Sequence, residues 1–139
     1  MIAEWLHHVT LHFPIVMTFA LAGLGAWTMR EESERTVSFI RWAGWATFAL
    51  TTVAVVAGIL SAPGWLGGDG PKVLSDHRDL GVTAWFVVGL AAWGYDHGVR
   101  HSDREFRLFG VAIWAVASFA VVGAGHWGGV GQYPELSPF

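Results

Sequence analysis

The chain has 139 residues, of which 53% are hydrophobic and only 14% are charged, and its formal net charge is −3. The charge is too small, and the basic residues too scattered, to indicate a nucleic-acid partner. Cysteine is absent, which excludes disulfides, thiolate metal sites and a covalently attached c-type haem. A mean hydropathy of +0.44 is typical of a membrane protein, and the length predicts a single domain over residues 1–139.

Four nearly continuous apolar runs follow one another along the chain, at roughly 5–28, 37–61, 79–99 and 106–126. Each reaches the length of about 20 residues that crosses a bilayer as a helix. We therefore predict an all-α fold, an integral membrane four-helix bundle of up-and-down topology. The first run is not typical of a secretory signal peptide, because its front end carries Glu4 and three further runs follow it. No internal repeat is evident, and the Gly- and Pro-rich segment from Ser61 to Gly81 is expected to be one long loop.

Basic residues lie mostly in the two short connections of this arrangement. The connections, taken from Met29 to Arg41 and from Gly98 to Arg107, carry six arginines, Arg30, Arg35, Arg41, Arg100, Arg104 and Arg107. The other side carries only Lys72 and Arg78. The positive-inside rule therefore places the short connections in the cytoplasm and both termini on the outer, periplasmic side. We expect a multi-pass protein of the bacterial inner (cytoplasmic) membrane.

Five of the seven histidines fall in the outer half of the predicted bundle. The first run opens with His7, His8 and His12, His77 precedes the third run, and His126 ends the fourth. His8 and His12 are four residues apart and share a helix face, whereas His7 and His12 are separated by about 140° around the helix. The five histidines come from three helices, so convergence on one site is permitted.

A b-type haem is the cofactor that this pattern favours. It needs two neutral imidazoles from facing helices, and small residues such as Gly58, Gly81 and Gly123 would make room for the macrocycle. We rank His12 and His126 first as ligands, because polar residues at membrane depth usually face the bundle interior and carry function. His77 and His7 come next, and Arg78 is expected to neutralise haem propionates.

Two alternatives remain open. A non-haem metal ion is compatible with three imidazoles from the set His7, His8, His12, His77 and His126, completed by Asp76 or Asp79. A cofactor-free structural or assembly subunit of a respiratory complex would use the same histidines only for local hydrogen bonds or to line a quinone pocket. His97 and His101 form an H-x-x-x-H pair at the cytoplasmic end of the third run, where no third ligand is apparent.

The stretch "HHVTLHFPIV" resembles the opening of a four-span bacterial membrane family of unknown function. The first helix of that family carries H-P-x-x-x-H-F-P, which His7, His12, Phe13 and Pro14 match, while His8 replaces the first proline. The segments "AGILSAPG" and "DHRDLG" are similar to the corresponding family segments, and "GHWGGVGQY" is similar to the closing G-H-x-G-G-x-x-x-Y. The resemblance covers essentially the whole chain.

Members of that family are similar in layout to small membrane b-type cytochromes and tend to occur beside c-type cytochromes and respiratory redox proteins. The resemblance therefore implies a redox role, with one or two haems b held by the matched histidines His7, His12, His77 and His126. It implies an electron carrier at the periplasmic side, between quinol or a larger redox complex and a c-type cytochrome. Such a chain is an electron-transfer protein or oxidoreductase subunit rather than a stand-alone enzyme, and an oligomer is left open.

Overall fold

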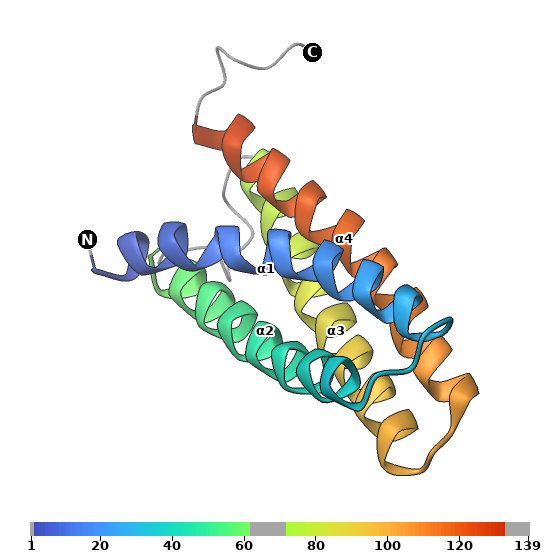
Figure 1. Cartoon of the computed structure of the whole chain (residues 1–139). Helices are drawn as coiled ribbons and strands as arrows, with labels where there is room; N and C mark the ends of the chain where they lie inside the picture. The colour runs from blue at the N-terminus through green and yellow to red at the C-terminus, as the bar shows by residue number, and fades with distance from the viewer. Residues whose placement is uncertain (1, 62–71, 133–139) are drawn as a thin grey trace.

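The computed structural model describes residues 2–61 and 72–132, which form four long α-helices (Figure 1). They are α1 (Ile2–Thr28), α2 (Glu34–Ser61), α3 (Lys72–Arg100) and α4 (Arg104–Gln132). No strand occurs within these two ranges, so the predicted all-α fold is confirmed there. Residues 62–64 of "AGILSAPG" and Tyr133 of the closing motif lie outside the described residues.

Three of the four helices are long and apolar enough to cross a membrane, namely those over Trp5–Thr28, Glu34–Ser61 and Arg104–Gly128. Helix α3 does not meet the same criterion, because Asp79 and Asp96 bound its uncharged stretch and that stretch is rich in Gly and Trp. The prediction of one loop from Ser61 to Gly81 is wrong over residues 72–81, which are helical. Charged residues end an apolar run without ending a helix, since most of them are adequate helix formers.

The helices pack as two hairpins, α1–α2 and α3–α4, with α1 also packed on α4 and α2 on α3. Figure 1 shows that the hairpins lie together at the end that carries the two short connections. They diverge toward the other end, where the N-terminus lies and where α2 ends and α3 begins. Pro14 lies inside α1, and a proline in a helix interior removes a backbone hydrogen bond and favours a bend.

The converging end is held by close helix packing and by charge pairs. A side chain at Gly110 would place its Cβ 2.5 Å from the backbone nitrogen of Tyr95, so glycine is what allows α4 to approach α3 this closely. Asp96 is buried and pairs with Arg41 of α2 and, at 2.9 Å, with Arg100 one turn further along α3. The pair with Arg41 ties the two hairpins together at this end.

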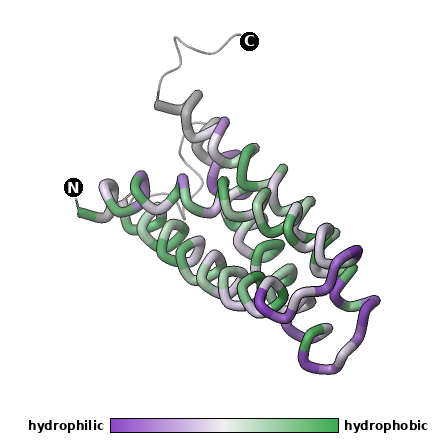
Figure 2. The backbone as a smooth tube through the Cα atoms, viewed as in Figure 1, coloured by the Kyte–Doolittle hydropathy of each residue, from purple (hydrophilic) through white to green (hydrophobic). Residues whose placement is uncertain are grey.

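The outer surface of the bundle is apolar along the middle of all four helices. Large exposed side chains include one from each helix, Phe19, Val56, Phe86 and Phe119, whereas hydrophilic residues gather at the end with the short connections (Figure 2). Exposed apolar surface of this extent marks contact with another apolar phase. The chain is therefore a helical membrane protein with a surface compatible with a lipid bilayer.

The second hairpin repeats the first with a constant offset, although the sequence shows no repeat. Helices α1 and α3 begin at Ile2 and Lys72, and α2 and α4 begin at Glu34 and Arg104, which is 70 positions in each case. The turns agree as well: Glu31 donates to the Trp27 carbonyl as His101 does to the His97 carbonyl, again 70 positions later. The backbone structure therefore repeats, and different side chains form it in the two hairpins.

Candidate functional site

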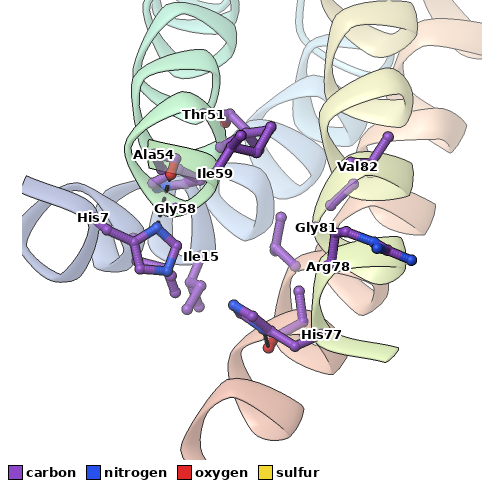
Figure 3. A pocket seen from close by; sticks show the side chains of 16 residues that line it. His7, Ile15, Thr51, Ala54, Gly58, Ile59, His77, Arg78, Gly81 and Val82 are labelled. Atoms are coloured by element: carbon purple, nitrogen blue, oxygen red, sulfur yellow. Dashed lines mark hydrogen bonds between the residues drawn. The ribbon is translucent and has the colours of Figure 1, made fainter. Parts of the chain in front are cut away.

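One pocket lies between the two hairpins, where they diverge, and all four helices line it (Figure 3). Its walls are mostly aliphatic, and its polar groups are few. Two histidines line it, His7 from α1 and His77 from α3. The pocket thus brings together one histidine from each hairpin, two of the five that the sequence places in the outer half of the bundle.

The ring of His7 is fixed by a contact across the first hairpin. Its Nδ1 lies 2.7 Å from the backbone carbonyl oxygen of Ala54 in α2. A carbonyl can only accept a hydrogen bond, so Nδ1 carries the proton. In the neutral imidazole the lone pair is then on Nε2. His7 is half-buried, and burial together with this hydrogen bond restricts the rotation of the ring.

His77 has the same arrangement in the second hairpin. Its Nδ1 donates to the carbonyl of Ala124 in α4 at 2.7 Å. His77 is also half-buried, and its neutral ring likewise has the lone pair on Nε2. A backbone carbonyl bound to one ring nitrogen is the usual way in which proteins orient a histidine whose other nitrogen ligates a metal.

The two rings face each other across the pocket. Their centres are 5.9 Å apart and their planes are inclined at 85°, so the rings do not stack. In Figure 3 the nitrogen of each ring that is not bonded to a carbonyl lies on the side toward the other ring. The arrangement presents two imidazole lone pairs to one region of space.

Arg78 is the permanently charged residue among the described residues that line the pocket. Its side chain is 26% exposed, and its Nε lies 2.8 Å from Oδ1 of Asp79. In Figure 3 the guanidinium points away from the two histidine rings. Its fork of N–H donors matches a carboxylate, so it is able to bind an acidic group of a bound molecule.

The other predicted ligands lie elsewhere. His8 is exposed, although its ring centre is 5.7 Å from that of His7. His12 and His126, which the sequence ranks first, are both exposed and do not line the pocket. The ring of His126 packs instead beside Trp127, with centres 5.8 Å apart. The structure thus brings together His7 and His77 and leaves His12 and His126 on the outside of the bundle.

The structure gives no support to a non-haem metal site in the part of the chain that it describes. Within residues 2–61 and 72–132 no group of three or more His, Asp or Glu side chains is placed to hold a metal ion. His97 and His101 do form a close pair, with ring centres 4.3 Å apart, and Phe106 packs on His97. They lie at the opposite end of α3 from the pocket.

Two features of the site could not be predicted from the sequence. The carbonyls of Ala54 and Ala124 orient the histidines, yet a backbone acceptor has no sequence signature. Gly128 lies against the His77 ring, and the sequence indicates this contact only through the spacing of the two residues. His7 precedes Gly58 by the same number of residues as His77 precedes Gly128, which becomes meaningful once the repeat is known.

Comparisons with known proteins add no further assignment. No protein-family model matches this chain, and no curated protein and no solved structure matches it either.

Proposed function

We propose that this chain is a membrane-bound b-type cytochrome in which His7 and His77 would together hold one haem between the hairpins. The observation that carries the proposal is the facing pair of rings, each oriented through Nδ1 by a carbonyl of its own hairpin. When bound, the haem supplies reversible one-electron chemistry at its iron. The chain supplies the ligands, their orientation and an apolar surrounding.

The separation of the rings suits two ligands on opposite sides of one metal ion. An imidazole nitrogen binds a first-row metal at about 2 Å, and the ring centre lies about 1 Å behind it, so two such rings have centres about 6 Å apart. The centres of His7 and His77 are 5.9 Å apart. The inclination of 85° between the planes is acceptable, because two imidazoles bound to one metal ion are free to differ in rotation about their bonds to it.

The pocket suits an amphipathic planar group with one acidic edge. Aliphatic side chains such as Leu11, Ile15 and Val55 form most of its wall, and Arg78 at its margin would hold a propionate. The cavity volume is about 70 Å³, which is smaller than a porphyrin. Binding therefore requires lining side chains to rotate or the hairpins to part further, and the divergence of the hairpins at this end favours such a movement.

The membrane topology completes the proposal. Helix α3 joins α4 through a three-residue turn and packs along it, and its middle exposes Phe86 and Trp93 as the other helices expose their apolar residues. We therefore take α3 as the fourth span. With the arginine-rich connections in the cytoplasm, both termini and the histidine pair lie on the periplasmic side.

This placement supports electron transfer on the outer side of a bacterial inner membrane. Quinol or a larger redox complex is the expected donor, and a c-type cytochrome the expected acceptor. The facing pair of His7 and His77 provides the ligands of one haem, so we propose one haem per chain. The chain acts as an electron carrier or oxidoreductase subunit and not as a stand-alone enzyme.

An absorption spectrum of the purified protein tests the proposal. Protein from haem-sufficient cells should show a b-type spectrum, with bands that sharpen on reduction by dithionite. Haem content should be about one per chain. A colourless preparation would refute the cytochrome and leave the cofactor-free structural subunit.

A further inference from the structure

We propose that Gly58 and Gly128 are positioning residues for the two histidines, one in each hairpin, and that they set the ligand geometry of a single shared haem from both sides. The inference rests on the proposed haem and goes beyond it, because it assigns a role to residues that do not ligate. It starts from the backbone repeat between α1–α2 and α3–α4 and from the contacts of the two glycines.

The same three-part arrangement occurs once in each hairpin. A histidine on the first helix donates through Nδ1 to a carbonyl on the second helix, from His7 to Ala54 and from His77 to Ala124. A glycine follows that carbonyl by one helical turn, at Gly58 and at Gly128. All three parts of the second arrangement lie 70 positions after their counterparts, which is the offset of the helices themselves.

Each glycine touches the ring of its histidine. A Cβ added at Gly58 would lie 3.0 Å from both Cε1 and Nδ1 of His7. At Gly128 the corresponding distances to Cε1 and Nδ1 of His77 are 2.8 Å and 3.0 Å. These distances are well inside the optimal contact separation of about 3.5–4.0 Å. A methyl group at either position would therefore push the ring away from its carbonyl.

Contact with a histidine ring distinguishes Gly58 and Gly128 from other described glycines that meet side chains, such as Gly89 and Gly94, which meet Phe48 and Phe109. Gly98 and Gly110 meet the backbone of the facing helix, which is the usual role of glycine in helix packing. Gly123 on α4 would meet only Leu80, at 3.8 Å, and Gly23 on α1 would meet nothing within 4 Å. At Gly58 and Gly128 the missing side chain makes room for an imidazole.

The chemical consequence follows from the Nδ1 hydrogen bond. A carbonyl that accepts from Nδ1 makes the imidazole a more basic ligand, and a more basic ligand favours the oxidised iron. Displacing the ring by an alanine lengthens this bond and makes the ligand less basic. Gly58→Ala and Gly128→Ala should each raise the reduction potential of the haem and change the electron paramagnetic resonance of its ferric form. Because the two arrangements are equivalent, the shifts should have the same sign.

The test compares Gly58→Ala and Gly128→Ala with Gly23→Ala, whose added Cβ meets nothing within 4 Å, by redox titration and by electron paramagnetic resonance of the purified holoprotein. The expected result is a raised potential in the first two variants and no change in Gly23→Ala. A haem protein in which all three variants match the parent would overturn this inference and leave the proposed function intact. Absence of haem from the parent itself would overturn the proposed function.

A second measurement does not depend on the haem and covers variants that fold poorly. Thermal unfolding in detergent should show that Gly58→Ala destabilises the parent but not the His7→Ala variant, in which the ring is gone. Likewise, Gly128→Ala should destabilise the parent but not the His77→Ala variant. It should still destabilise the His7→Ala variant, in which the His77 ring is intact. If Gly58→Ala were equally destabilising with and without the His7 ring, the contact would not be what the glycine serves.

Discussion

His7 and His77 face each other between the two hairpins with their ring centres 5.9 Å apart, although 70 positions separate them in the chain. Each is oriented by a carbonyl from the second helix of its own hairpin. Neither hairpin holds both rings, so the pair exists only when the two hairpins are packed together. A molecule bound by both rings would in turn stabilise that packing, since it binds the folded form alone.

His7→Ala or His77→Ala should remove the haem. Each substitution deletes one of two metal ligands, and we expect haem content per chain to fall at least about tenfold, the range seen when metal sites lose supporting groups. Haem content is measured by the pyridine haemochrome method on purified protein. His12→Ala and His126→Ala are the matched controls, because both side chains are exposed and lie outside the pocket lining. Loss of haem in His12→Ala with retention in His77→Ala would contradict the assignment.

The topology is testable with fusions at the two ends of the bundle. An alkaline phosphatase joined after Phe139 should be active, because we expect the C-terminus in the periplasm, where this reporter folds. The same enzyme inserted between Arg30 and Ser33 should be inactive, because the arginine-rich connections are expected in the cytoplasm. The reverse pattern of activities would place the histidine pair on the cytoplasmic side.

Asp96→Asn should destabilise the converging end of the bundle. The Asp96 side chain is only 9% exposed and pairs with Arg41 on α2 and Arg100 on α3, so the substitution leaves a largely buried arginine without its counter-charge. We expect the free energy of unfolding to fall by about 1–3 kcal/mol, measured by thermal unfolding in detergent.

Two other variants grade the Asp96 effect. Arg100 is 61% exposed, so Arg100→Gln should cost less than Asp96→Asn. The Asp79 side chain is 66% exposed, so Asp79→Asn should lower the free energy of unfolding by no more than about 0.5 kcal/mol. An equal fall in the free energy of unfolding in Asp96→Asn and Asp79→Asn would show that the buried charge pair does not specifically stabilise the bundle.

Gly110→Ala should weaken the packing of α3 on α4. The added Cβ would lie 2.5 Å from the backbone nitrogen of Tyr95, and a backbone, unlike a side-chain tip, cannot rotate out of the way. Overpacking of this kind typically costs about 1–3 kcal/mol. Gly23→Ala meets nothing within 4 Å and should be neutral or stabilising by up to about 1 kcal/mol, because alanine is the better helix former. Comparable stability of the two variants would refute the close approach.

The sequence by itself determined the helices. Apolar runs of about 20 residues predict helices whatever their neighbours are, and three of the four predicted runs lie within helices that are long and apolar enough to cross a membrane. The sequence also predicted α3, but not its first turns, because Asp76, Arg78 and Asp79 end the apolar signal before they end the helix.

Only the tertiary structure decided which histidines meet. Helical periodicity separates His7 from His12 by about 140° around α1, but it does not say which of the two faces meets a neighbouring helix. That depends on the rotation of each helix in the bundle and on where the hairpins diverge, and these are set by long-range packing, such as the close approach of Gly110 to Tyr95. The packing places His7 and His77 in the pocket and His12 and His126 on the surface. The order of residues along the chain does not by itself specify this arrangement.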